Sequence, residues 1–523
     1  MQCDQRLNGC ERCAKSGWTC PGYRNTSDLM FVDESSNIAR RARNQTSAIK
    51  ALQKCNTDKG TAWRSLGRAR PSQEPPSPLV VHPSIVIEDL ALPCSLAHYV
   101  VEQSSSNVHF DIASNGCLEA GMKALGMARL TQIYGDTVTR AEARRLYMHA
   151  LRLTNASLGS KSGVRRDSTL LTANVLSIFE AIMSLHKSFD EWSAHINGAA
   201  TLLYLRGNTL FQTTTGGRLF MQTVTTLTIN CETRRCPIPS HVIETLKRAE
   251  QYIVSPNEMT WRYQWLNVKV TNLQAETLAD NSPRNRSDAE GILHRALEID
   301  EELASLFRNP PSTWDYTVVP TQQTNNLIFG DNYHVYRHFL SPQLWNGMRG
   351  ARLVLRGIMK QAIATGGPEL LSRLRAQSLI TLRDSTQIVR QLQLDILATI
   401  PQQLDPSLAD RDPLVAALKA SNPEIHSQQP GSLKANFASF GGMEANPFRH
   451  QKQSSPDLPR VQLSGGYILQ WSLFIAAKCD PPGGEIRTWV VELLRMMSRT
   501  LGIRQALVIA NMLEMDGDKP VRG

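Results

Sequence analysis

Apolar residues along this chain recur mostly at steps of three and four, the spacing that places them on one face of an α-helix. The stretch 167–188 shows this most clearly, because Leu171, Val175, Ile178, Ile182 and Leu185 recur there at alternating steps of four and three. Asp167 stands where an N-cap would precede them. We therefore predict a helix over 167–188 with these five residues as its buried stripe.

A second stretch, 287–307, follows the same rule with Ile292, Ala296, Ile299, Leu303 and Leu306. Ser287 and Glu290 have the spacing of a capping box before it. Further helices are predicted over 117–133, 141–158, 191–206, 218–230, 240–252, 332–361, 369–399, 463–478 and 484–501. Strand-like alternation is scarce. The chain is thus predicted to be mostly α, with one large all-α body over residues 85–517.

Two stretches interrupt the helical pattern. Residues 70–83 are dense in proline, which removes backbone donors and blocks helix formation, so this stretch is predicted to be a linker. Residues 425–460 are rich in Ser, Gln, Gly, Pro and Asn, and are predicted to be a mobile insertion in the body.

Charge divides the chain unevenly. Its 523 residues carry a net charge of +10, and residues 1–70 hold thirteen Lys or Arg against six Asp or Glu, a net +7. A basic arm on a nearly neutral body is typical of proteins that bind polyanions, although a solvated basic tail has the same composition. No apolar stretch approaches eighteen residues, so no membrane span is expected.

Four of the ten cysteines lie within the first twenty residues: Cys3, Cys10, Cys13 and Cys20, spaced C-x6-C-x2-C-x6-C. Such short spacings suit a tetrahedral zinc site, and because the segment has few apolar side chains, metal binding would have to supply its folding energy. A redox pair at Cys10 and Cys13 would need a βαβ context, which is not predicted. An unfolded tail with idle thiols stays an alternative. The other cysteines are scattered, as in a reducing compartment.

These cysteines resemble the second half of the fungal Zn(II)2Cys6 binuclear cluster. Asp4 follows the family's third cysteine, Lys15 stands two residues after the fifth, and Pro21-Gly22-Tyr23-Arg24 matches the common exit sequence. The family's first Cys-x2-Cys pair and the basic, base-reading stretch after it are absent. The resemblance implies zinc held by Cys3, Cys10, Cys13 and Cys20, with two more thiolates outside this sequence. We expect the natural start to lie upstream; a truncated relative is the alternative.

A second resemblance lies in the body. Residues 467–477 followed by Ile486-Arg487-Thr488-Trp489-Val490 are similar to the C-terminal pattern of the fungal-specific transcription factor domain, with Ser472 in place of the family's proline. Residues 192–200 resemble an internal pattern of the same domain. The resemblance implies three parts: a partial zinc cluster at 1–24, a basic arm and proline-rich linker at 25–84, and the helical regulatory domain at 85–517.

Together the resemblances imply a nuclear, zinc-dependent, DNA-binding regulator of RNA polymerase II genes. Arg12 and Lys15 would contact phosphates, which position a protein without reading sequence, and Arg40, Arg41 and Arg43 would contact phosphates or serve nuclear import. Duplex DNA is the expected partner, bound weakly as the chain stands, together with a homodimer or heterodimer of the body. The alternative is a truncated regulatory or scaffold protein without specific DNA binding. Common hydrolase and nucleotide-binding motifs are absent from the sequence, so we expect no enzyme.

Overall fold

The computed structural model describes residues 87–99, 112, 115–183, 189–253, 259–279, 284–311, 314–321, 326–336, 341–374, 382, 384–404 and 465–515. Except for residues 87–89, all of these belong to the unit Leu90–Gly523, which is distinct from the unit Met1–Asp89. The described residues are predominantly α-helical, as the sequence predicted.

The first half of the helical order runs η2 (Ile87–Leu90), α3 (Ala91–Tyr99), α5 (Gly116–Tyr134), α6 (Thr137–Leu158), α7 (Lys161–Arg165), α8 (Asp167–Met183), α9 (Asp190–Arg206), η3 (Gly207–Gln212), α10 (Thr214–Arg234), α11 (Ser240–Ala249) and η4 (Glu250–Tyr252). The second half comprises α12 (Met259–Ala279), α13 (Arg284–Leu306), β1 (Tyr316–Pro320), β2 (Asn332–Tyr336), α14 (Ser341–Arg373), α16 (Ser385–Leu397), α17 (Ile400–Leu404), α20 (Gly465–Lys478), α21 (Glu485–Thr500) and α22 (Arg504–Met515). The sequence reading had not singled out α12 or α22.

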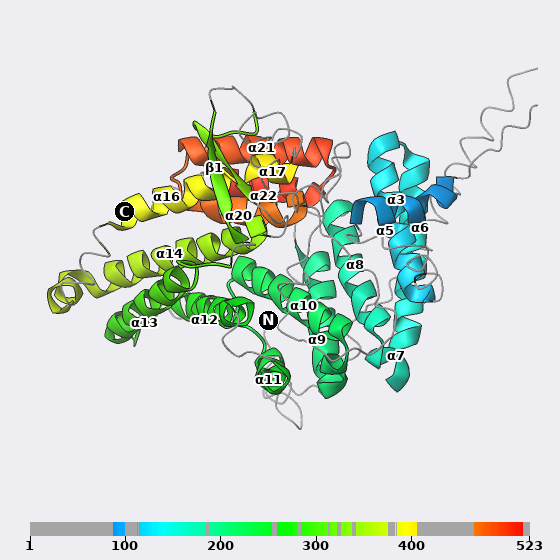
Figure 1. The fold of residues 1–523 in the computed structure, drawn as a ribbon, viewed down its shortest axis with the longest axis horizontal. Helices are drawn as coiled ribbons and strands as arrows, with labels where there is room; N and C mark the ends of the chain where they lie inside the picture. The colour runs from blue at the N-terminus through cyan, green and yellow to red at the C-terminus, as the bar shows by residue number, and fades with distance from the viewer. Residues whose placement is uncertain are drawn as a thin grey trace, which may run out of the picture. The chain divides into compact units, whose positions relative to one another are not determined.

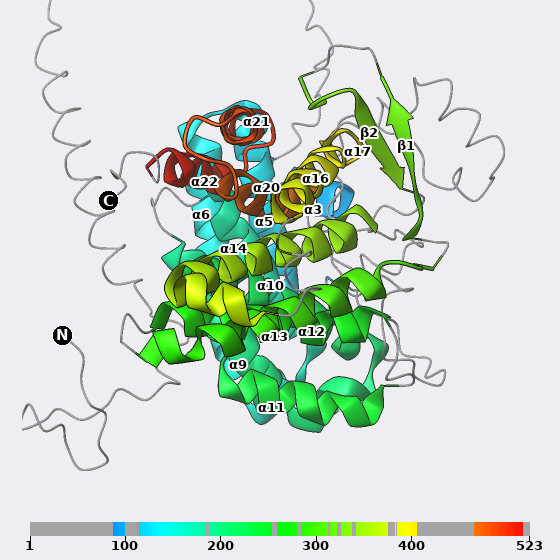
Figure 2. The same ribbon diagram turned by 90° about the vertical axis from the view of Figure 1, so that its left-hand side faces the viewer.

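Two groups of helices within this unit are joined through α10. Figure 1 shows α5, α6 and α8 side by side in one group and α12, α13 and α14 in the other, and α10 contacts both α8 and α12. The C-terminal helices α20, α21 and α22 return to the body, where α20 packs on α14 and α16 (Figure 2). Segments distant in sequence therefore build one interior.

Helix α8 is central to the first group. Every side chain from Ser168 to Met183 is buried, because α5, α6, α9, α10 and α22 all contact it. The predicted stripe is confirmed for Leu171, Val175, Ile178 and Ile182, and Leu185 lies outside the described residues. Asp167 is the first residue of the helix rather than the residue before it. The sequence pattern thus identified one buried face, whereas the structure buries all of them.

Helix α13 confirms the second predicted stripe. Its five predicted core residues, Ile292, Ala296, Ile299, Leu303 and Leu306, are all buried, and they contribute to a core shared with α12 and α14. The helix begins at Arg284, three residues before the predicted capping box, so the box lies inside the first turns. The predicted existence and face of the helix were right, and its start was wrong by less than one turn.

The prediction of a helix over 332–361 was wrong for its first residues. The body is therefore mostly α rather than all-α. Asn332–Tyr336 forms β2, which pairs antiparallel with β1 in the register Val319 to Tyr333. The outer edge of β2 is satisfied by distant groups: the backbone N–H of His334 donates to the carbonyl of Ala398 at 2.8 Å, and Gln402 bonds both backbone groups of Tyr336. These partners give the strand hydrogen bonds that periodicity cannot reveal.

The observed helix boundaries also differ from the predicted ones at α14 and α16. This helix begins at Ser341 and ends at Arg373, with a non-helical Gly367 (φ 65°) directly before Pro368. The predicted helix 369–399 is therefore divided between the end of α14 and α16. The predicted insertion 425–460 and the linker 70–83 lie outside the described residues.

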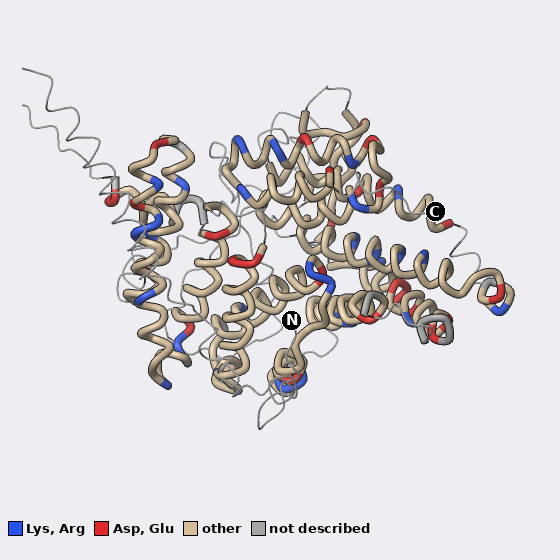
Figure 3. The backbone as a smooth tube through the Cα atoms, turned by 180° about the vertical axis from the view of Figure 1, so that it is seen from behind, with Lys and Arg blue, Asp and Glu red and all other residues tan. Residues whose placement is uncertain are grey.

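Charged residues of both signs are interspersed over the helices (Figure 3), in keeping with a body of small net charge. Glu301 and Glu302 are exposed, and they pair with Arg308 and Lys269, respectively. No helix in the described part of the chain is long and apolar enough to cross a membrane.

Candidate functional site: an interhelical cavity

The predicted zinc and DNA-binding residues lie outside the part of the chain that the structure describes. This holds for all nine of them: Cys3, Cys10, Cys13, Cys20, Arg12, Lys15, Arg40, Arg41 and Arg43. Within the described ranges, no three His, Cys, Asp or Glu side chains gather as potential metal ligands. The zinc cluster and its DNA contacts therefore stay predictions.

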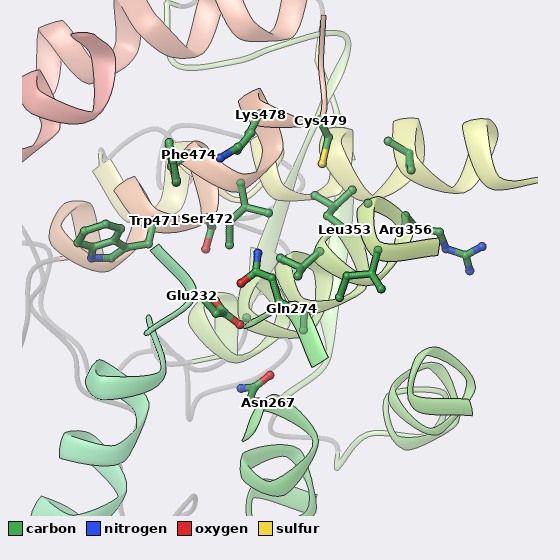
Figure 4. A pocket seen from close by; sticks show the side chains of 18 of the residues that line it. Glu232, Asn267, Gln274, Leu353, Arg356, Trp471, Ser472, Phe474, Lys478 and Cys479 are labelled. Atoms are coloured by element: carbon green, nitrogen blue, oxygen red, sulfur yellow. The ribbon is translucent and has the colours of Figure 1, made fainter. Parts of the chain in front are cut away.

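The body itself contains a cavity of about 710 Å³. Its walls come from α10, α12, α14, α16 and α20, which are brought together from more than 250 residues of sequence (Figure 4). Apolar side chains such as Leu353, Phe474 and Ile475 line much of it. Ligand pockets in proteins commonly measure roughly 300–1,000 Å³, so this space is large enough for a small molecule.

Glycines on α14 help to explain both the wall and the space. At Gly350 an added Cβ would lie 3.3 Å from Cδ1 of Ile475, so this glycine permits the close approach of α14 and α20. At Gly357, about two helical turns later, an added Cβ would meet no atom within 4 Å. Both glycines line the cavity. The helix thus approaches its neighbour at one point and leaves open space at the next.

Helix α10 presents a polar row to the cavity. Thr225, Thr228 and Glu232 recur at steps of three and four, and all three line it. The hydroxyl of Thr225 donates to Oε1 of Gln264 at 3.0 Å, and that of Thr228 donates to the carbonyl of Val224 at 2.9 Å. Both hydroxyl protons are therefore already engaged within the protein.

Glu232, at the end of this row, is an ionisable group whose pKa responds to its environment. It keeps partial exposure, but protein atoms surround its carboxyl group, so the exposed surface faces the cavity. Burial raises the pKa of Glu232 to about 7, and the hydroxyl of Thr271, which donates to Oε1 at 3.4 Å, opposes this shift. Glu232 is therefore poised to exchange a proton near neutral pH.

Two amide oxygens in the wall lack protein partners. Oε1 of Gln274 on α12 and Oε1 of Gln343 on α14 are buried and accept no hydrogen bond from any residue that the structure describes. A buried acceptor without a partner is costly, and sites that leave such groups open are candidates for ligand binding. Together with Glu232, these oxygens make the wall rich in acceptors.

Basic residues occupy more exposed parts of the cavity lining. Arg235, Lys360 and Lys478 are exposed, and the Lys478 ammonium lies 5.4 Å from the ring centroid of Phe474. Figure 4 shows Lys478 and Cys479 on the side opposite Glu232. Burial raises the pKa of the Cys479 thiol to about 11, so this thiol stays protonated at neutral pH. The arrangement suits binding better than nucleophilic chemistry.

The two stretches of the body that carry the second resemblance meet next to this cavity. Trp192 of α9 stacks on Trp471 of α20 with ring centroids 4.9 Å apart, and its Nε1 donates to the Tyr467 hydroxyl at 2.6 Å. Phe189 completes the cluster at 5.4 Å from Trp471. Trp471 also lines the cavity. These aromatic residues therefore pack in the core, and Trp471 also borders the cavity.

Two further residues of the helical body have structural roles. Nε2 of His195 lies 2.8 Å from the Tyr147 hydroxyl. Cys231 is buried, and burial raises the pKa of its thiol far above the ordinary range. The backbone N–H of Cys236 donates to the Cys231 carbonyl at 3.0 Å, which closes the end of α10.

Sequence reasoning missed the cavity for an identifiable reason. The predicted helix 218–230 ended before Glu232, so the row of Thr225, Thr228 and Glu232 was not recognised as one face. A polar row on an otherwise apolar helix was the available signal. The other walls come from helices far away in sequence, and their juxtaposition has no local signature.

Replacing Glu232 by Gln is expected to stabilise the protein at pH 8 by about 1–3 kcal/mol. The folded pKa lies near 7, above the ordinary value of 4.5, so the native state holds the proton more tightly. The wild-type protein therefore loses stability as the pH rises toward 7, because Glu232 must ionise in a buried environment. The variant does not lose this stability, because Gln does not ionise. Urea unfolding at pH 5 and pH 8 should show the difference mainly at pH 8.

The exposed Glu298→Gln on α13 is the matched control for this prediction, because Glu298 lies outside the cavity lining. It should change stability equally at both pH values. An identical pH profile for wild type and Glu232→Gln would contradict the environment assigned to Glu232.

Comparisons with known proteins give one partial match. No family model matches the chain, and no solved structure matches it. A stretch of 116 residues, 22% of the chain, is 32% identical to part of an uncharacterized protein of Emericella nidulans. The chain thus spans 23% of the length of that relative.

Proposed function

We propose that this protein is a fungal-type, zinc-dependent, DNA-binding regulator of RNA polymerase II genes, whose helical body binds a small-molecule effector in the interhelical cavity. The observation that carries the effector role is the cavity of about 710 Å³, which is lined by both apolar and polar side chains. This combination is typical of ligand sites. The DNA-binding role is supported by the half-cluster of cysteines and by the net +7 of residues 1–70.

In this proposal the two parts have separate tasks. Cys3, Cys10, Cys13 and Cys20 bind zinc, and Arg12, Lys15, Arg40, Arg41 and Arg43 supply contacts to phosphates. The body acts in the nucleus as the regulatory part and as the surface for a homodimer or heterodimer. The cavity has a binding rather than a catalytic role, because the Cys479 thiol is held protonated and Glu232 lies on the opposite side.

The DNA-binding role predicts weak, salt-sensitive binding by the 523-residue chain. Phosphate contacts release counterions, so affinity should fall steeply with salt and differ little between specific and scrambled duplexes. Replacing Arg40, Arg41 and Arg43 together by Gln should lower the slope of log K against log salt by about 2–3. Fluorescence anisotropy at several salt concentrations measures this slope.

The control replaces three basic residues of the body, Arg145, Arg295 and Arg495, which pair with acidic neighbours, and it should leave the slope unchanged. Selective, salt-tolerant binding would mean that another part of the chain reads DNA. No binding of duplex DNA at low salt would favour the alternative, a regulatory or scaffold protein that keeps the helical body.

A further inference from the structure

The wall of the cavity contains hydrogen-bond acceptors that the described residues leave unsatisfied or only weakly satisfied. Oε1 of Gln274 and Oε1 of Gln343 have no partner among the described residues, and the Glu232 carboxylate accepts a single long bond from Thr271 there. The hydroxyl of Thr277 donates to the backbone carbonyl of Gln274 at 2.7 Å, so its proton does not serve the side-chain Oε1 of Gln274. A ligand that complements this wall must therefore bring donors.

The charged residues of the cavity lining also favour a ligand that brings donors. Glu232 is the one acidic residue in the cavity lining as the structure describes it, and its carboxyl group is removed from bulk water. Three of the four basic lining residues, Arg235, Lys360 and Lys478, are exposed, so solvent screens them, and Lys478 lies over the Phe474 ring. The fourth, Arg356, is buried and forms an ion pair with Asp300. A buried charge without a counter-charge contributes more to selectivity than exposed ones do.

We propose that the cavity binds a predominantly apolar molecule that carries a protonated amine, with Glu232 as the counter-charge of that amine. This inference rests on the proposed role of the cavity as an effector site. Gln274, on the same side as Glu232 in Figure 4, accepts a further N–H of the amine, and Leu353, Phe474 and Ile475 contact the apolar part. Charge-assisted hydrogen bonds of this kind are the strong ones.

The protonation behaviour of Glu232 supports this assignment. With a pKa of about 7, the empty site holds a mixture of acid and carboxylate at neutral pH, and a bound cation selects the carboxylate. Amine affinity should therefore weaken below pH 7, where binding must expel a proton. The other titratable or charged groups of the lining are Arg235 on α10, Tyr263 on α12, Arg356 and Lys360 on α14, and Lys478 and Cys479 on α20.

A matched series of probes tests the proposal on the full chain. Isothermal titration at pH 8 compares 4-phenylbutylamine, 4-phenyl-1-butanol and 4-phenylbutyrate, which share their apolar part and differ in the polar group. The amine should bind about tenfold more tightly than the alcohol or more. Glu232→Gln should remove that advantage and leave the alcohol unaffected, whereas Glu298→Gln should change neither.

A second variant separates this inference from the effector role. Gly357→Phe directs a ring into the open space at Gly357 and should abolish binding of every probe, while its circular dichroism at 222 nm should match that of wild type. If all probes bind equally and Gly357→Phe blocks them, or if the carboxylate binds best, the effector site stands and the amine assignment is overturned. If no probe binds, or if Gly357→Phe binds them all normally, both proposals are overturned.

Discussion

Replacing Asp300 by Ala should destabilise the protein by about 3–5 kcal/mol. Asp300 of α13 is 4% exposed and accepts hydrogen bonds from Arg352 at 2.8 Å and from Arg356, both on α14. The variant would leave the Arg356 guanidinium buried without its counter-charge, and losing one member of a buried ionic cluster costs more than the cluster contributes. Urea unfolding followed by circular dichroism at 222 nm measures the change.

Two variants distinguish this effect from a general sensitivity of α13. Glu301, the next residue, is exposed, so Glu301→Ala should change stability by no more than about 0.5 kcal/mol. Replacing Asp300, Arg352 and Arg356 together by apolar residues should recover much of the loss, because no unpaired charge is left behind. Equal effects of Asp300→Ala and Glu301→Ala would refute the role assigned to the cluster.

Trp192→Ala should likewise cost about 3–5 kcal/mol. The indole is 3% exposed, stacks on Trp471 and donates to the Tyr467 hydroxyl, so its removal opens a cavity and leaves a buried hydroxyl without its donor. The contact joins α9 to α20, and Trp192 and Tyr467 are 275 positions apart in sequence. Thermal and urea unfolding should both register the loss.

Trp192→Phe separates the two contributions, since it keeps an aromatic ring but removes the indole N–H. We expect a smaller loss of about 1–2 kcal/mol, because the hydrogen bond from the indole N–H to the Tyr467 hydroxyl is lost. Leu205→Ala, on the exposed side of the same helix, should have almost no effect. A Trp192→Ala protein as stable as Leu205→Ala would show that the aromatic cluster does not hold α20 against α9.

The helical class of the body, and the residues that face its core, could be read from local spacing. Ile178 of α8 and Ile299 of α13 were predicted as core residues and are buried, because a helix that packs on any surface must place its apolar row there. The ends of helices were less certain. Backbone groups at an end are satisfied by whichever partner is nearby, and sequence spacing does not name that partner.

Local spacing was misleading where distant residues supplied the hydrogen bonds. The segment 332–336 was predicted to be helical, yet it is a strand, because Ala398 and Gln402 bond its free edge. Its Tyr333, Val335 and Tyr336 have high strand propensity, which was the signal available in the sequence.

By itself, the sequence determined the helical periodicity, the uneven charge and the cysteine spacing from which the zinc and DNA hypotheses derive. Only the tertiary structure decided where a ligand could bind. The cavity exists because α10, α12, α14, α16 and α20 converge around Gly350 and Gly357. The pKa of Glu232 depends on that enclosure. Burial and proximity are properties of packed neighbours, and the residues that become neighbours here lie hundreds of positions apart.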